Sequence, residues 1–211
     1  MIIILRNAVA ESSGGCLTLE SEHGRWRLCV AEKKASLELE LSEAELPIDV
    51  DVPAHPNAAL DVLFDVARSL ADYSWAPGRL KIAVVGPPGS GKSTFVRRLL
   101  GLPPPAGPTP RPEVHRVVIM GREAEVVDMP GGVSADADCA VVVAPLDVYE
   151  EPPAVRGGKA VLVGSRADLG SEALLALYVQ EVRPVAAYAL DLRTAPRWRL
   201  ASVLASCADS K

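Results

Sequence analysis

The stretch Gly86-Pro-Pro-Gly-Ser-Gly-Lys-Ser-Thr94 decides the fold of this chain. It fits the pattern GxxxxGK[ST] at every fixed position, and it lies between an apolar run at 81–85 and a helical pattern at 91–100. The glycines let the backbone curl so that successive N–H groups point inward, and the helix adds its positive N-terminal end. In this context the stretch predicts a binding site for the phosphates of a nucleoside triphosphate.

Each position of this phosphate loop has an expected role. We expect Lys92 to reach the β- and γ-phosphates and to act as a catalytic residue, while Ser93 offers its hydroxyl to Mg²⁺. Thr94 is expected to face the α-phosphate side. Four further residues are expected to contact the nucleotide, namely Gly86, Gly89, Ser90 and Gly91. The loop alone leaves ATP and GTP open as the nucleotide.

The chain around the loop alternates between buried strands and helices. Continuous apolar runs follow at 114–119, 124–127, 139–144, 160–163 and 184–190. Helical patterns lie at 91–100, 171–182 and 195–207. Apolar runs of this length suit a mainly parallel sheet that is covered on both faces. The sequence therefore predicts an α/β fold, a three-layer sandwich built around the phosphate loop.

A second element of the site is the strand that ends in Asp128 and continues as Asp-Met-Pro-Gly131. A carboxylate at the end of this strand can hold Mg²⁺ through water, and the N–H of Gly131 can meet the γ-phosphate. An ordinary turn without nucleotide contact is the alternative for so short a pattern.

The N-terminal part of the chain has a different pattern. Apolar and polar residues alternate at 25–30, 36–41 and 48–52, which predicts antiparallel strands with one solvent-facing side. A helical stripe then begins behind a candidate N-cap at Asn57. We therefore expect a small β-domain at 1–56, a connecting helix and linker at 57–78, and a nucleotide-binding domain at 79–211.

Charge and composition limit the choice of partners. Residues 1–78 carry 6 Lys/Arg and 13 Asp/Glu, whereas residues 79–211 carry 16 and 14. An acidic β-domain repels phosphate backbones, so we expect it to bind a protein rather than nucleic acid directly. No stretch approaches the roughly 20 apolar residues that span a bilayer.

The four cysteines, Cys16, Cys29, Cys139 and Cys207, form no CxxC pair and lie near no histidine at metal-ligand spacing. Zinc is therefore not expected. We interpret them as buried or incidental thiols in a reducing cytoplasm, which predicts a cytoplasmic protein.

From 79 to 207 the sequence resembles the translation-factor and Ras-like GTPase family. The resemblance rests on the phosphate loop, on the hairpin that ends in DxxG, and on Ser165-Arg-Ala-Asp168, which is similar to the [NT]KxD motif. It implies GTP with Mg²⁺, and contacts from Ser165, Arg166 and Asp168 to the base. Serine and arginine depart from the motif, but arginine can still cover a base with its planar head.

The same resemblance implies two further features of the site. Thr109 stands where the first switch threonine lies, as a catalytic and metal-binding residue, although an ordinary position in a Pro-rich loop is the alternative. Ala189-Leu190 resembles the SA[KL] element. Gly132 occupies the place of the glutamine that orients the attacking water, so the resemblance implies slow hydrolysis.

Two other functions remain open from the sequence. The layout of a β-rich domain, a helix and then a phosphate loop also resembles the RNA 5′-polynucleotide kinases, although neither a DxDxxQ-like acid nor a basic channel is visible. The missing glutamine also suits a module that binds nucleotide without hydrolysing it. GTP retention without phosphate release, or transfer to an RNA 5′-hydroxyl, distinguishes these alternatives.

Overall fold

The computed structural model describes residues 2–5, 8–13, 16–21, 24–31, 34–40, 80–105, 107, 109–120, 122–131, 137–155 and 158–208. Its described strands form one sheet in the order β11-β10-β9-β6-β8-β7-β1-β2-β3-β4-β5. The helix predicted at 57–78, the strand predicted at 48–52 and the boundary near residue 78 lie outside the described residues.

The nucleotide-binding part is built on β6 (Leu80–Val85) at its centre. The two neighbours of β6 are β8 (Arg122–Asp128) and β9 (Cys139–Pro145), and both run parallel to it. Beyond β9 lie β10 (Lys159–Ser165) and β11 (Ala186–Leu190), also parallel. The remaining neighbour of β8 is β7 (Glu113–Ile119), which is antiparallel to it. Every residue of β9 is buried, as expected for a central parallel strand.

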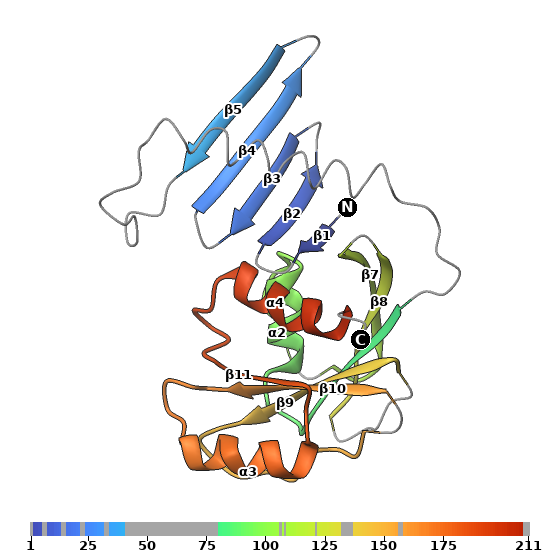
Figure 1. Ribbon diagram of the computed structural model, residues 1–211, viewed down its shortest axis with the longest axis vertical. Helices are drawn as coiled ribbons and strands as arrows, with labels where there is room; N and C mark the ends of the chain where they lie inside the picture. The colour runs from blue at the N-terminus through green and yellow to red at the C-terminus, as the bar shows by residue number, and fades with distance from the viewer. Residues whose placement is uncertain are drawn as a thin grey trace.

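Helices cover both faces of this sheet, which confirms the predicted α/β architecture. Figure 1 shows α2 (Lys92–Leu99) and α4 (Arg197–Ala208) on one side and α3 (Glu172–Val182) on the other. The first two pack their buried side chains into the larger core, to which α4 contributes Leu200 and Leu204. The smaller core beneath α3 contains Tyr178 and side chains from β6, β9 and β10.

The N-terminal strands form an antiparallel meander, as predicted. They are β1 (Ile2–Leu5), β2 (Ala8–Ser13), β3 (Cys16–Ser21), β4 (Gly24–Ala31) and β5 (Lys34–Glu40). The meander continues the main sheet because β1 pairs in parallel with β7, placing Ile3 opposite Val118. Ile4 and Val9 are buried in the same core as α4. The proposed division into domains stays a prediction, and the described strands on its two sides share a sheet and a core.

Arg197, at the start of α4, connects the meander to α2. Its guanidinium lies 3.2 Å from a carboxylate oxygen of Glu11, and its backbone N–H donates to Glu20 at 3.1 Å. The same guanidinium donates twice to the backbone oxygen of Leu99, near the end of α2. A cation at this position also complements the negative C-terminal end of that helix.

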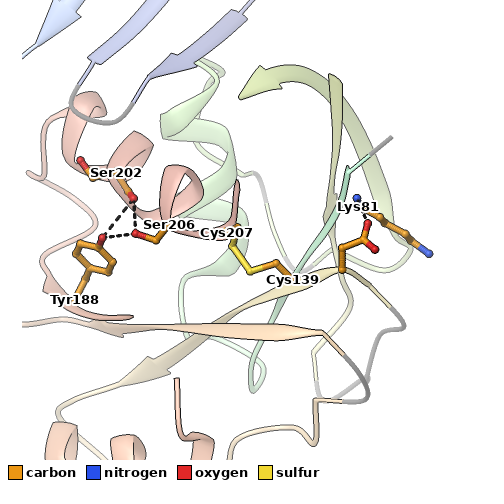
Figure 2. The surroundings of a disulfide bond; sticks show 7 residues. Lys81, Cys139, Tyr188, Ser202, Ser206 and Cys207 are labelled. Atoms are coloured by element: carbon orange, nitrogen blue, oxygen red, sulfur yellow. Dashed lines mark hydrogen bonds between the residues drawn. A yellow bond between two sulfur atoms is a disulfide. The ribbon is translucent and has the colours of Figure 1, made fainter. Parts of the chain in front are cut away.

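A disulfide joins Cys139, the first residue of β9, to Cys207 near the end of α4 (Figure 2). Both residues are buried, at 0% and 4% exposure. The interpretation of these two cysteines as free thiols was therefore wrong. They are 68 residues apart in sequence, and only the packing of α4 across β9 brings them together.

Candidate nucleotide site

The phosphate loop lies between β6 and α2, as its sequence predicted. Gly91 has a φ of 100°, in the left-handed region, and Gly86 has a φ of 154°. A Cβ on Gly86 would collide with the backbone oxygen of Val143, in the adjacent strand β9. Glycine at position 86 therefore lets the loop pass close to the neighbouring strand.

Lys92 lies folded into this loop. Its ammonium donates to the backbone oxygens of Gly86 at 3.0 Å and Pro87 at 2.7 Å, and the residue is 6% exposed. Burial lowers the pKa of Lys92, while the carboxylates of Asp128 and Glu150 act in the opposite direction. A charged donor is thus held within the segment expected to surround the β- and γ-phosphates.

The three residues predicted to bind metal meet beside Lys92. The hydroxyl oxygens of Ser93 and Thr109 lie 2.5 Å apart, and the Thr109 hydroxyl lies 3.3 Å from Oδ2 of Asp128. They come from three separate segments, namely the first turn of α2, the loop before β7 and the end of β8. The sequence indicated each of these residues separately, and the structure places the three side chains next to one another.

The chemistry of this group fits Mg²⁺. Asp128 is 1% exposed, and its Oδ1 atom has no hydrogen-bond partner among the described residues. A buried carboxylate oxygen without a partner is unfavourable unless a ligand satisfies it. Carboxylate and hydroxyl oxygens are hard ligands of the kind that Mg²⁺ accepts. Within the described ranges no cluster of three or more His, Cys, Asp or Glu side chains offers another metal site.

Gly131, the glycine of the DxxG pattern, lies against the tip of the phosphate loop. A Cβ added to it would come within 2.7 Å of the Pro88 side chain. Gly132, where the resemblance places a missing glutamine, is outside the described residues.

A cavity of about 270 Å³ opens beside the phosphate loop. Four segments line it: the phosphate loop with Thr94, the loop after β9, the region around Ser165, and the turn after β11. The residues that line it are Gly89, Ser90, Gly91, Thr94, Asp147, Ser165, Arg166, Asp168, Leu169, Asp191, Leu192 and Arg193. Ser165, Arg166 and Asp168, predicted to contact the base, are thus brought to the loop.

These three residues differ in what they contact. The Ser165 hydroxyl lies 2.7 Å from the backbone oxygen of Ser90, to which it donates. Arg166 donates to the carboxylate of Asp147 at 2.7 Å and to the backbone oxygen of Gly89 at 3.0 Å. Asp168 is exposed, and no residue in the described part of the chain hydrogen-bonds to its carboxylate. Two of the three hold the loop in place, and the third is available to a ligand.

No motif in the sequence pointed to Asp147 or to the turn at 191–193, and both line the cavity. The predicted element Ala189-Leu190 instead lies in β11, where Leu190 is 4% exposed and outside the cavity lining. Asp191 accepts hydrogen bonds from the N–H of Arg193 and the hydroxyl of Thr194, which lower the pKa of its carboxyl, the Thr194 bond most. An Asp followed three residues later by Thr, directly after a strand, is the turn signal that could have located this segment.

Comparison with known proteins supports the predicted resemblance. Residues 81–157 match the profile of the family described as "50S ribosome-binding GTPase". The match covers the phosphate loop, Thr109 and the DxxG segment, and it ends before Ser165. It confirms the resemblance to P-loop GTPases, here in a divergent form, and supports a GTP-binding protein.

One similar solved structure is that of the bacterial selenocysteine-specific elongation factor, at 13% identity and a TM-score of 0.49. The match covers 62% of this chain and 28% of that chain, so this chain spans well under half of that factor. No curated protein sequence matches this chain. Among the described helices, none is long and apolar enough to cross a membrane.

Proposed function

We propose that this protein binds Mg²⁺-GTP, with the triphosphate on the loop Gly86 to Thr94 and the guanine base in the adjoining cavity. The observation that carries this proposal is that the phosphate loop and Ser165, Arg166 and Asp168 line one and the same cavity. The family match at 81–157 supports the phosphate half of the site. The base half rests on the cavity and on the exposed carboxylate of Asp168, to which no described residue hydrogen-bonds.

Ser93, Thr109 and Asp128 would hold the magnesium ion. A magnesium ion held by these residues would supply positive charge to the phosphate oxygens of the nucleotide. Lys92 adds a second positive charge from within the loop, and the N–H groups of the loop bind the remaining phosphate oxygens. Gly131, which lies against Pro88, would donate its N–H to the γ-phosphate.

Hydrolysis is proposed to be slow and to proceed by in-line attack of water on the γ-phosphorus. Lys92 and Thr109 would stabilise the transferred group, but a glycine follows Gly131 where the related GTPases have a water-orienting glutamine. Loss of such a group lowers the rate by orders of magnitude unless a partner supplies it.

Guanine preference would come from Asp168, which can accept hydrogen bonds from guanine N1 and N2. Adenine presents no matching pair of donors on that edge, so a contact of this kind favours guanine over adenine. Arg166 lies beside the same cavity, where its planar head can cover the base.

The remaining proposals concern the context of the site. The predicted acidic β-domain at 1–56 would bind a protein partner, with 57–78 as the connection to the nucleotide-binding part at 79–211. We propose that the protein does not contact nucleic acid directly, because residues 1–78 carry 13 Asp/Glu and only 6 Lys/Arg.

The test is a titration of the purified full chain with GTP, GDP and ATP in the presence of Mg²⁺. Lys92→Ala should weaken binding of all three roughly hundredfold, because it removes a charged donor to the phosphates. Asp168→Ala should weaken GTP and GDP while leaving ATP unchanged. Glu172→Ala, an exposed carboxylate outside the cavity lining, is the matched control and should bind like the wild type.

Each result has a distinct meaning. Unchanged nucleotide binding by Lys92→Ala would contradict the proposed phosphate site. Equal affinity of the wild type for ATP and GTP would contradict the proposed guanine preference. Phosphate release measured over hours separates slow hydrolysis from nucleotide retention without turnover. Transfer of a phosphate to an RNA 5′-hydroxyl would instead support the kinase.

A further inference from the structure

Asp147 lies in the loop that follows β9, outside every motif that the sequence suggested. We propose that Asp147 is a positioning residue of the nucleotide site, whose carboxylate fixes the Arg166 guanidinium between the phosphate loop and the base cavity. This inference rests on the proposed nucleotide binding and names a residue that the site depends on.

The contacts form a chain across the site. One arm of the Arg166 guanidinium donates to Oδ2 of Asp147 at 2.7 Å, and another donates to the backbone oxygen of Gly89 at 3.0 Å. All three residues line the cavity. Arg166 has a φ of 56°, an uncommon backbone conformation for arginine. The residue before it, Ser165, donates a hydrogen bond to the backbone oxygen of Ser90. The guanidinium is therefore held at two points rather than free in solvent.

Because residue 166 is an arginine, a carboxylate beside it can fix the orientation of its side chain. A guanidinium carries several N–H donors in one rigid plane, so bonds to two fixed acceptors also fix the orientation of that plane. A lysine ammonium is a point charge on a flexible stem and gains no comparable orientation from a second acceptor. Arginine at position 166 and aspartate at position 147 thus act as a pair.

The loop that carries Asp147 is anchored on both sides of it. The backbone N–H of Leu146 donates to the oxygen of Ser165 at 3.0 Å. On the other side, the buried Tyr178 donates to the oxygen of Val148 at 3.3 Å and accepts from the N–H of Glu150 at 2.9 Å. The carboxylate is therefore presented to Arg166 by backbone that α3 and β10 already hold.

The charge state of the carboxyl agrees with this geometry. The hydrogen bond from Arg166 is the main cause of a lowered pKa at Asp147. Asp147 is therefore ionised at neutral pH, as the contact with a guanidinium requires.

The experiment measures dissociation constants and off-rates of fluorescent GDP and GTP with the full chain. Asp147→Asn should raise the dissociation constant of both nucleotides roughly three- to tenfold, mainly through a faster off-rate, because an exposed charge-assisted bond is lost. Glu151→Gln, which removes an exposed charge from the same loop, should bind like the wild type. The melting temperatures of the nucleotide-free proteins show whether either change alters folding.

A double variant distinguishes positioning from a general loss of charge. Arg166→Lys should weaken binding on its own, and Asp147→Asn should add little to it, because the two residues act through one contact. Independent, additive effects would overturn the proposal, as would an Asp147→Asn variant that binds like Glu151→Gln. If the wild type binds neither nucleotide, the proposed function itself fails, whereas tight wild-type binding with an unaffected Asp147→Asn variant overturns only this inference.

Discussion

Lys92 is a charged side chain held largely out of water, and this has a consequence for the nucleotide-free protein. Burial lowers its native pKa below the ordinary 10.5, so the unfolded chain binds the proton more tightly than the native chain does. The protonated ammonium therefore lowers native stability, and stability should rise as pH increases from the lowered pKa toward 10.5. Lys92→Met should lack this rise.

Urea unfolding of wild type and Lys92→Met at a series of alkaline pH values tests this prediction. Comparing the two proteins removes the effect of other groups, such as Tyr149 and Tyr178, whose pKa values are raised in the native state. Parallel curves for the two proteins would contradict it.

A comparison of two glycines in the phosphate loop distinguishes the cost of backbone strain from the cost of steric crowding. Gly86 and Gly89 both have positive φ, but an added Cβ at Gly86 meets the Val143 oxygen, whereas one at Gly89 meets nothing within 4 Å. Gly86→Ala should therefore destabilise the protein by about 2 kcal/mol more than Gly89→Ala. Chemical denaturation of both variants measures the difference, and equal losses would show that φ alone sets the cost.

At the scale of elements, the described segment 146–155 after β9 is an irregular loop whose path depends on Tyr178. This ring is fully buried, stacks on Tyr149 with centroids 5.6 Å apart, and hydrogen-bonds to the backbone at Val148 and Glu150. Tyr178→Phe should cost about 1–2 kcal/mol, because it leaves the Glu150 N–H without this partner. Tyr149→Phe, which loses only an exposed bond to Glu181, should be close to neutral.

Hydrogen exchange at the Glu150 amide gives a local measure of the same contact. The amide should exchange faster in Tyr178→Phe than in the wild type or in Tyr149→Phe. Unchanged protection in Tyr178→Phe would mean that the loop is held by other contacts.

The elements were predictable because their signals are local. The phosphate loop, the strand that ends in Asp128 and the helix at 171–182 each follow from neighbouring residues. Asp147 and the turn at 191–193 were missed because they reach the site only when β9, β10 and β11 lie side by side. The pairing of Cys139 with Cys207 likewise depends on a helix crossing a distant strand, which no local pattern contains.

For the whole molecule, the disulfide makes a large predicted contribution to stability. It links residues 68 apart, and a loop of that length corresponds to about 4 kcal/mol in the chain-entropy description. Reduction should therefore lower the melting temperature by roughly 8–16 °C for a protein of this size. The closed segment contains the cavity residues from Asp147 to Arg193.

Melting curves of wild type and Cys207→Ser, each with and without a dithiol reductant, check this prediction. Cys16 and Cys29, which are register partners in β3 and β4, occur in both proteins and so act as an internal control. The oxidised wild type should melt well above Cys207→Ser, and the two should converge on reduction. Equal melting temperatures before reduction would contradict the prediction.

The pairing of β1 with β7 also sets an order of events during synthesis. β1 is synthesised well before its parallel neighbour β7, which contains Val118, and β1, β2 and β3 contact α4, near the end of the described chain. Contacts between segments so distant in sequence form late, because the intervening chain must first be made and then ordered. Apolar side chains of the nascent N-terminal strands, such as Ile3 and Val9, therefore stay exposed to solvent until the nucleotide-binding part has folded and can pack against them. A chaperone that shields these strands during translation would protect the chain at its most vulnerable stage.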